Sequence, residues 1–413
     1  MSTTPPATRP GTIDPEQHEF RPPRKYIRVK EDVTAFERSP AHRDITQYVA
    51  RLADAVRGVP CSDVGPMRPI IRQLVGLLKA LQQLVFDTPT IDAEGSRFGN
   101  EAFRTWHSLM EKKIAEITPE FTPRPALKEV NSYLAHSFGH RDRLDYGTGH
   151  ELNFLLWLLC LDKIGVLGPE DDRAVVFRVF YSYILLMRQL QSTYWLEPAG
   201  SHGIWGLDDY QFLPFVFGAA QLDGHPSFRP ICIIDNDLVR DNHREYLYLD
   251  AIHYINSIKT ESLQWHSPML NDIAGVPYWS KVASGMVKMY KAEVLGKLPV
   301  VQHFLFGTLL QFPNAQQVDE QRAREVAEAR ATLAENAERF GLPDGQVMAQ
   351  ILGPDGQVRQ VPLRTPEETE TGPDHYHDPD NICCYHRVPS VHAAAAASGG
   401  NDLSISDIII PFD

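Results

Sequence analysis

Residues 143–151, RLDYGTGHE, combine features that could bind an anion. Gly147 and Gly149 flank Thr148, and glycine allows a backbone to approach a ligand closely. An apolar helical pattern begins directly afterwards, so free backbone N–H groups and the positive end of the helix dipole would face this loop. With Arg143 nearby, the segment predicts a phosphate cradle. The alternative is a tight turn in which Thr148 caps the helix.

Residues 197–214, EPAGSHGIWGLDDYQFLP, place two adjacent carboxylates in a glycine-rich loop that leads into a helix. One of them, Asp208, is suited to cap that helix. The second, Asp209, would suit magnesium near a phosphate-binding loop, because this ion takes one or two carboxylates together with phosphate oxygens. Ser201 and His202 do not form G-x-S-x-G, which excludes the nucleophile elbow of a hydrolase.

Two aromatic residues, Tyr278 and Trp279, follow Pro277 at the expected start of a helix. Their rings could pack on the proline ring of another peptide. They could equally be core aromatics at a helix start, since such rings bury a large apolar area. The sequence leaves both interpretations open.

Polar residues Gln302 and His303 lie between apolar neighbours in residues 297–307, KLPVVQHFLFG. A buried histidine with an internal hydrogen bond is the ordinary expectation for such a position. His375 and His377 stand in a polar segment without further ligands, so they do not predict a metal site. The chain also lacks a P-loop, an H-E-x-x-H motif and a C-x-x-C pair.

The elements that must position these residues are helices. Apolar residues recur at intervals of three and four, whereas long stretches with alternating β-branched residues are scarce. A proline-rich break at residues 118–125 separates the first third from the rest. The pattern predicts an all-α fold with helices over residues 44–57, 67–86, 101–117, 150–164, 173–195, 242–259 and 279–296.

The ends of the chain differ from its middle. Residues 1–22 have no periodicity and predict a disordered N-terminus. A single helical domain is expected over residues 23–313. Residues 314–413 hold 17 acidic and 7 basic residues and predict an acidic, largely disordered tail, with a solvated helix over 319–340. Of the net charge of −13, the tail carries −10, so the body is nearly neutral, which disfavours nucleic-acid binding.

Hydropathy and cysteine usage bear on the compartment. No stretch approaches the roughly 20 apolar residues that cross a bilayer. The first residues, MSTTPPATRPGTIDPEQ, lack the apolar region of a secretory signal. The five cysteines are scattered and odd in number, which indicates reduced thiols. These features predict a protein of the cytoplasm or nucleus.

Together these segments resemble the phosphotyrosyl phosphatase activator (PTPA) family of type 2A phosphatase activators. The resemblance covers about residues 22–313. It is carried by RLDYGTGHE (143–151), CLDKIGVLG (160–168), EPAGSHGIWGLDDYQFLPF (197–215), VPYWSKVASGMVKMYKAEVL (276–295) and PVVQHFLFG (299–307). It implies an all-helical fold with core, lid and linker subdomains. It also implies dependence on ATP and Mg²⁺, binding to the catalytic subunit of a type 2A serine/threonine phosphatase, and peptidyl-prolyl cis–trans isomerase activity on a proline-containing peptide.

The resemblance also implies roles for individual residues. The positions that match the family's nucleotide contacts are Arg143, Thr148, Gly149, Gln302 and His303. Those that match its magnesium side are Gly203 and Asp209. Ile204 and Trp205 fall in the loop expected to face the phosphatase, and Tyr278 and Trp279 could line a peptide groove. A non-catalytic assembly chaperone for the phosphatase is the alternative function.

This chain departs from the family pattern in a few places. Arg141 adds a basic residue beside Arg143, and Leu305 stands where a basic residue is often found. The second change would weaken one phosphate contact. The long acidic tail is similar to that of fungal members.

Overall fold

The computed structural model describes residues 12–91, 99–199, 206–259, 262–324, 327–328, 348–352 and 358–362. Contacts along the chain group it into two units, Met1–Gln311 with Asp380–Asp413, and Phe312–Pro379. Each unit is described by itself. Among the described residues no helix is long and apolar enough to span a bilayer.

Helices dominate the first unit, and the all-α prediction is confirmed. Each amphipathic pattern in the first third forms a helix that buries its apolar face, such as Leu74, Leu77, Leu78 and Leu81 in α3. Proline at the first helical position starts both α2 and α3. The helices of this part are α1 (Lys30–Glu37), α2 (Pro40–Ala55), α3 (Pro69–Asp87), α4 (Ala102–Ile117) and α5 (Leu127–Ala135). The proline-rich break forms the 3₁₀ turns η1 (Thr118–Glu120) and η2 (Arg124–Ala126).

The middle of the chain supplies the helices at the centre of the core. Helix α6 (Thr148–Lys163) is buried from Glu151 to Asp162 on all sides, which explains its nearly continuous apolar sequence. After the 3₁₀ turn η3 (Pro169–Asp171), the expected helix over 173–195 is made of α7 (Asp172–Ala174), a π-helical stretch (Val175–Phe180) and α8 (Tyr181–Tyr194).

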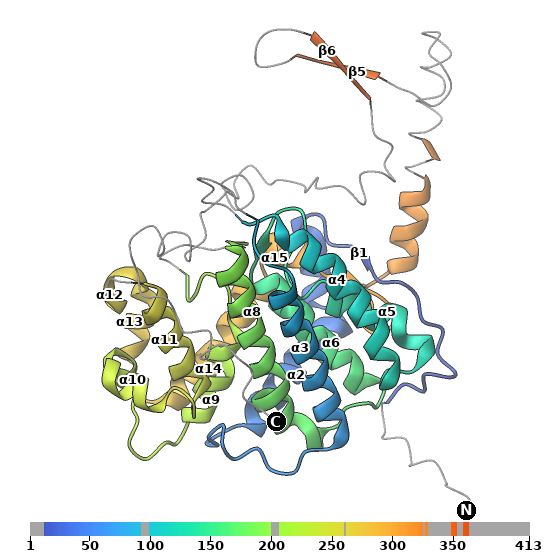
Figure 1. Ribbon diagram of the computed structural model, residues 1–413. Coiled ribbons are helices and arrows are strands. Elements are labelled where there is room, and N and C mark those ends of the chain that lie inside the picture. Colours follow the sequence, from blue (N-terminus) through green and yellow to red (C-terminus); the bar gives the residue numbers. More distant parts are fainter. Residues whose placement is uncertain are drawn as a thin grey trace, which may run out of the picture. The chain divides into compact units, whose positions relative to one another are not determined.

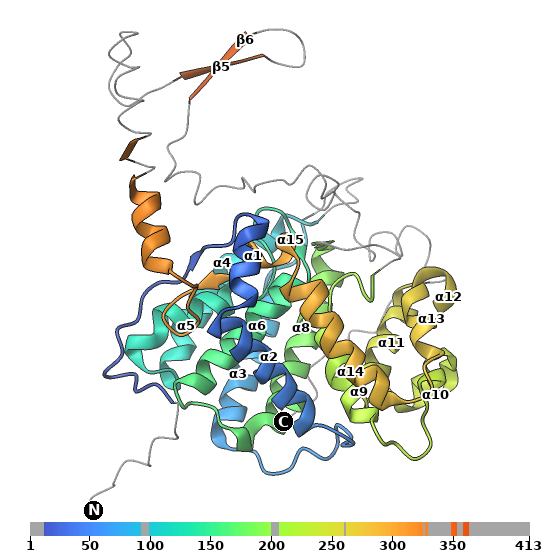
Figure 2. The same cartoon turned by 180° about the vertical axis from the view of Figure 1, so that it is seen from behind.

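The remaining helices complete the unit. They are α9 (Leu213–Leu222), α10 (Asn236–Asn242), α11 (Leu247–Ile258), α12 (Leu263–His266), α13 (Pro268–Ala274), α14 (Trp279–Tyr290) and α15 (Leu298–Val301). A 3₁₀ turn, η6 (Pro230–Ile234), precedes α10, and a π-helical stretch, Lys291–Leu295, continues α14. Helices α9 and α14 lie side by side between the group α10–α13 and the group that contains α3, α6 and α8 (Figures 1 and 2). This arrangement agrees with the predicted core, lid and linker.

Two short strand pairs join distant parts of the first unit. Strand β1 (Arg24–Lys25) pairs antiparallel with β4 (Leu305–Phe306), and β2 (Asp145–Tyr146) pairs parallel with β3 (Glu197–Pro198). In the second unit, β5 (Met348–Leu352) and β6 (Val358–Pro362) pair antiparallel, and a helix covers 315–324. The hairpin is ordered structure within the segment predicted to be largely disordered. The rest of the predicted helix 319–340, apart from 327–328, lies outside the described residues.

The N-terminal prediction needs a correction, because residues 12–22 contact the helical body. The N–H of Ile13 donates to the carbonyl of Lys163 at 2.8 Å, and His18 Nε2 lies 2.7 Å from Thr308 Oγ1. The fully buried Glu129 carboxylate accepts from the N–H of Arg21 at 3.3 Å and from the N–H and hydroxyl of Thr308 at 2.7 Å each. Disorder was expected from composition alone, which does not reveal a buried acceptor more than 100 positions away. Residues 1–11 lie outside the described part.

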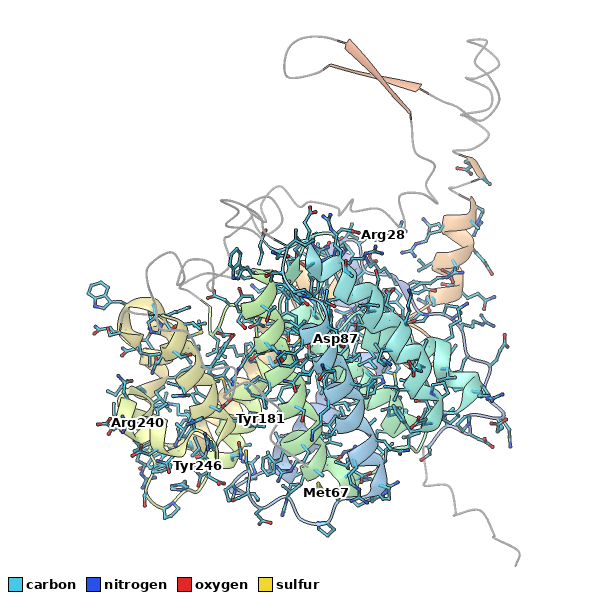
Figure 3. The ribbon with its side chains drawn as sticks, in the orientation of Figure 1. Arg28, Met67, Asp87, Tyr181, Arg240 and Tyr246 are labelled. Atoms are coloured by element: carbon cyan, nitrogen blue, oxygen red, sulfur yellow. The ribbon has the colours of Figure 1, made fainter. Side chains whose placement is uncertain are left out.

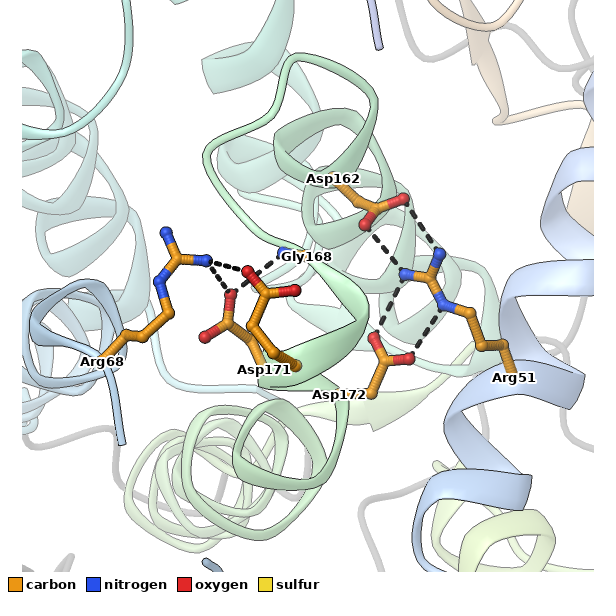
Figure 4. A network of polar contacts seen from close by, with 7 residues as sticks. Arg51, Arg68, Asp162, Gly168, Asp171 and Asp172 are labelled. Carbon is orange, nitrogen blue, oxygen red and sulfur yellow. Dashed lines mark hydrogen bonds and ion pairs between the residues drawn. The ribbon is translucent and has the colours of Figure 1, made fainter. Parts of the chain in front are cut away.

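Charged side chains fix α2 against the middle helices (Figure 4). The Arg51 guanidinium is 2.8 Å from Asp162 Oδ1 and 2.9 Å from Asp172 Oδ2. Both carboxylates are buried, and burial raises the pKa of Asp172 to about 6 although Arg51 opposes this. Nearby, Arg68 contacts Asp171 at 2.7 Å, and that carboxylate caps the N–H of Gly168. The network positions the end of α6 and the start of α7.

A buried ion pair connects α8 with α11. Arg188 Nη1 lies 2.7 Å from Asp250 Oδ2, and only 5% and 6% of the two side chains are exposed. The Arg188 guanidinium also lies over the Tyr254 ring, 4.3 Å from its centre. Tyr181, labelled in Figure 3, donates its hydroxyl to Asp250 Oδ1 at 3.1 Å. Burial opposes ionisation, but Arg188 and His243 hold the pKa of Asp250 below its usual value.

Cys61, Cys160 and Cys232 are free and buried. Burial raises the pKa of the Cys61 and Cys232 thiols to about 12. Burial also raises the pKa of the Cys160 thiol, so all three thiols stay protonated and are weak nucleophiles. Cys383 and Cys384 lie outside the described residues.

Candidate functional site

The loop before α6 ends in a turn that leaves Thr148 inside the helix. Gly147 occupies the capping position, and Thr148 is the first helical residue, so the alternative in which Thr148 caps the helix is wrong. The His150 ring Nδ1 accepts the N–H of Gly147 at 3.2 Å, and the N–H of His150 returns to the Gly147 carbonyl at 2.9 Å. These two hydrogen bonds between Gly147 and His150 close the turn, so the Thr148 hydroxyl is not needed to cap the helix.

Gly147 is required by a close approach of two loops. The N–H of Ala199 donates to the carbonyl of Tyr146 at 2.8 Å in the β2–β3 pairing. A Cβ on Gly147 would overlap the Ala199 carbonyl oxygen. The glycine therefore lets the segment ending at residue 199 lie directly against the start of α6. The predicted residues Gly203, Ile204 and Trp205 follow in 200–205, which lie outside the described residues.

Arg143 lies beside the turn, with its charge offset by a neighbour. Its Nε contacts Asp145 Oδ2 at 2.6 Å, and its Nη2 contacts Oδ1 at 3.2 Å. Between them, Leu144 has a left-handed backbone (φ 56°), which turns the chain sharply. Burial, and then the Arg143 guanidinium, hold the pKa of His150 well below its usual value. A neutral imidazole matches its role as acceptor for Gly147.

Glu151 connects the first turn of α6 to α9. Its Oε2 accepts the N–H of Phe212 at 2.9 Å and that of Leu213 at 3.1 Å, at the start of α9. The side chain is fully buried, and burial raises its pKa to about 8 although the two N–H groups oppose this. Glu151 lies within the helix expected over 150–164, and its role at the start of α9 was not predicted. The partners lie about 60 positions away, so no local signal could reveal them.

The prediction that Asp208 caps the helix after this loop is wrong, because α9 begins at Leu213 and Glu151 accepts its first N–H groups. Asp208 Oδ2 instead accepts the N–H groups of Tyr210 and Gln211 in the turn before α9, at 3.0 and 2.8 Å. Asp209 Oδ2 instead lies 2.9 Å from Lys259 Nζ, at the C-terminal end of α11. The pairing of Lys259 with Asp209 was not predicted. A lysine is common at the C-terminal end of a helix, where it interacts favourably with the helix dipole, so its presence there does not indicate a further partner.

Gln302 and His303 directly follow α15, and α15 packs against the first turn of α6. A Cβ on Gly149 would lie 3.5 Å from the Val300 carbonyl oxygen, an ordinary packing distance. Gln302 is 9% exposed and donates to the Pro299 carbonyl at 3.3 Å. His303 is half-buried. The start of α6 is therefore bordered by α15 on one side and, through Glu151, by the start of α9 on another.

The resemblance implies several nucleotide-binding positions. Thr148 and Gly149 lie in the first turn of α6, and Arg143 lies before this turn. Gln302 directly follows α15, the short helix that packs against the first turn of α6. The first N–H groups of a helix have no intrahelical acceptor and suit an anion. Asp209 belongs to the loop whose next residues bind Glu151. The described residues thus offer N–H groups to an anion and one carboxylate to a cation, while Arg143 and Asp209 are each engaged in an ion pair.

The proposed peptide groove needs a correction at one of its two aromatic residues. Trp279 is only 3% exposed and packs edge-to-face on Tyr248, with ring centres 5.0 Å apart. Its apolar ring is part of the core, so it is not available to a peptide. Tyr278 is 57% exposed and lies under the Arg229 guanidinium, 5.5 Å from the ring centre.

A family described as phosphotyrosyl phosphate activator (PTPA) protein matches residues 23–312 of the chain. The chain belongs to this family. The family prediction is confirmed, and the matched residues include every described residue of the candidate site.

Fungal relatives and a solved structure extend this PTPA assignment. The serine/threonine-protein phosphatase 2A activator 2 of Cryptococcus neoformans var. neoformans serotype D (strain JEC21) is 42% identical over 380 residues, 90% of each chain. That of Yarrowia lipolytica is 46% identical over 294 residues, 70% of this chain and 83% of the relative. The crystal structure of the PP2A phosphatase activator Ypa1 PTPA1 superposes with a TM-score of 0.68 at 36% identity, covering 74% of this chain and 99% of that one.

Proposed function

We infer that this protein is an activator of type 2A serine/threonine protein phosphatases. The observation that carries the inference is the PTPA match over residues 23–312, supported by relatives named phosphatase 2A activators at 42–46% identity. The Ypa1 PTPA1 structure, a PP2A phosphatase activator, shares the fold. The partner is accordingly a type 2A phosphatase, which we propose to be bound through its catalytic subunit in the cytoplasm or nucleus.

The proposal includes ATP and Mg²⁺. Arg143, the first-turn N–H groups of Thr148 and Gly149, and the side chains of Gln302 and His303 would hold the nucleotide. Asp209 would hold Mg²⁺ together with the backbone at Gly203, and the ion would neutralise phosphate charge there. Arg143 is already paired with Asp145, so a phosphate has to share or displace that carboxylate.

Loss of Asp209 tests the metal role. An Asp209→Ala variant should lose ATP-dependent reactivation of an inactive type 2A catalytic subunit, measured by phosphate release from a phosphopeptide. The matched control is Asp241→Ala, which removes an exposed carboxylate that pairs only with Arg240 among the contacts described. Full reactivation by the Asp209 variant, with helix content unchanged by circular dichroism, would refute the metal assignment. Retention of the phosphatase in a pull-down tests the partner separately.

We further propose peptidyl-prolyl isomerase activity as the catalytic contribution. The X–Pro bond has a rotation barrier of about 18–20 kcal/mol, and lowering it requires only a site that favours the twisted amide over both planar forms. The exposed ring of Tyr278 supports a proline contact, with Ile204 and Trp205 on the proposed phosphatase-facing loop. The burial of Trp279 favours the non-catalytic assembly chaperone, because it removes one of the two aromatic residues of the groove.

Catalyst and chaperone differ in their effect on a rate. The measurement is cis-to-trans relaxation of a proline peptide from the phosphatase, followed by NMR exchange with and without the protein. A catalyst increases the rate in proportion to its concentration, and Tyr278→Ala should reduce the increase. An unchanged rate at saturating protein would establish the chaperone instead.

A further inference from the structure

Asp209, the residue proposed to bind the metal ion, forms an ion pair with Lys259. The ammonium and carboxylate are 2.9 Å apart, with 19% and 13% of the side chains exposed. The backbone holds Lys259 in place, since its N–H donates to the Ile255 carbonyl at 3.0 Å at the end of α11. The neighbouring Asp208 carboxylate accepts two backbone N–H groups through its Oδ2.

A second polar group lies near this pair. His266 contacts the Ser267 hydroxyl through Nδ1 at 2.9 Å, while its buried Nε2 has no hydrogen-bond partner among the described residues. Burial, and then the Lys259 ammonium, lower the pKa of His266 to about 4, while Asp209 opposes this. A buried nitrogen without a partner costs free energy, which binding of a ligand would recover.

An ammonium and a divalent cation compete for the same carboxylate. A metal ion on Asp209 would stand within a few ångströms of Lys259, where the two positive charges repel in a partly buried site. The carboxylate can therefore take a cation only if the ammonium moves to another anion. A polyphosphate bound at the start of α6 would bring such an anion together with the metal.

We propose that Lys259 is a displaceable counter-ion that keeps divalent cations off Asp209 in the nucleotide-free protein and transfers to a phosphate oxygen when nucleotide and metal bind together. This inference rests on the proposed nucleotide site and assigns its order of assembly. The metal enters as a complex with the nucleotide and does not bind beforehand. Lys259 is thus a positioning residue that couples the two ligands.

The test uses Mn²⁺ as a paramagnetic probe of the full-length protein, with free Mn²⁺ measured by electron paramagnetic resonance. Wild type and the charge-preserving control Lys259→Arg should bind Mn²⁺ weakly without ATP. Lys259→Met should bind it about tenfold more tightly, within the usual range of coupling between two ligands. In the absence of metal, ATP should bind Lys259→Met several-fold more weakly than wild type, because a phosphate contact is lost.

Two results would overturn the proposal. One is equal Mn²⁺ affinity of wild type and Lys259→Met, and the other is a gain in Mn²⁺ affinity that persists when Asp209→Asn is added to Lys259→Met. Unchanged helix content by circular dichroism shows that the variants are folded. If wild type binds no ATP under any condition, the nucleotide part of the proposed function fails, whereas the Mn²⁺ comparison still decides whether Lys259 blocks the carboxylate.

Discussion

At the scale of single residues, Glu151 shows how a buried carboxyl serves structure beside a candidate site. It joins two helix starts, since it lies in the first turn of α6 and caps α9. Two N–H groups favour its charged form, and burial favours the neutral form by more. The balance makes the stability of the protein depend on pH.

The pH dependence has a definite sign. The pKa of Glu151 rises from 4.5 to about 8 on folding, so between these values the folded protein holds a proton that the unfolded chain releases. The stabilisation is complete below pH 4.5 and is lost as pH rises toward 8, with a slope of at most about 1.4 kcal/mol per pH unit. Glu151→Gln cannot titrate but keeps an oxygen acceptor. Urea unfolding should show a smaller loss of stability between pH 5 and pH 8 in this variant. Equal losses in both proteins would contradict the assigned pKa.

The two glycines of the GTG turn should respond differently to a methyl group. In Gly147→Ala the new Cβ would overlap the Ala199 carbonyl oxygen. We therefore expect the free energy of unfolding to fall by at least about 1–3 kcal/mol. Gly149→Ala places its Cβ at packing distance from Val300, so its stability should match or exceed that of wild type. Thermal unfolding of both variants tests this. A larger loss for Gly149→Ala would show that the loop contact is misassigned.

At this scale, sequence motifs could select candidate residues but not the contacts among them. Arg143 and Gly149 could be selected because they belong to a local pattern, a glycine turn before a helix. Lys259 and the role of Glu151 could not, because their partners are 50 to 60 positions away and are set by packing. Trp279 was ambiguous, since one aromatic residue after a proline serves a core as well as a groove.

At the scale of elements, the contact between α8 and α11 depends on the buried Arg188–Asp250 pair. Removing only one partner leaves an uncompensated charge in the interior, which costs about 3–5 kcal/mol. Removing both charges avoids this cost, and Asn at position 250 keeps an acceptor for the Tyr181 hydroxyl. The ion pair therefore fixes which residues of α8 and α11 face each other, and adds little net stability.

We expect Arg188→Met to destabilise the protein by about 3–5 kcal/mol. The double variant Arg188→Met with Asp250→Asn should be more stable than this single variant. Urea unfolding of wild type, both single variants and the double variant gives the coupling energy directly. Additive losses would mean that the pair contributes no coupling between α8 and α11.

Long amphipathic helices were predicted within a few residues of their ends, because three or more turns give a clear apolar periodicity. Helix α4 was expected over 101–117 and spans Ala102–Ile117. Short helices such as α12 and α15 have a single turn and no measurable period. The helix expected after the two adjacent carboxylates is α9, which is buried on all sides as α6 is.

At the scale of the whole molecule, the described core belongs to the Met1–Gln311 part of the first unit, and the family match ends at residue 312. We expect a chain truncated after residue 314 to keep its thermal unfolding temperature and its phosphatase binding. Truncation after Pro299 removes Thr308 and strand β4, so it should prevent folding. Differential scanning calorimetry and pull-down compare the three chains. A marked loss of stability on the shorter deletion would assign the tail a structural role.

The pairing of β1 with β4 has a consequence for biosynthesis. Arg24 lies opposite Phe306, and the Glu129 carboxylate binds both Arg21 and Thr308, so the first and last parts of the domain close on each other. While the chain is being made, the early helices leave the ribosome long before their closing strand exists. The domain can close only when residues 305–308 emerge, and residues 313–413 follow them.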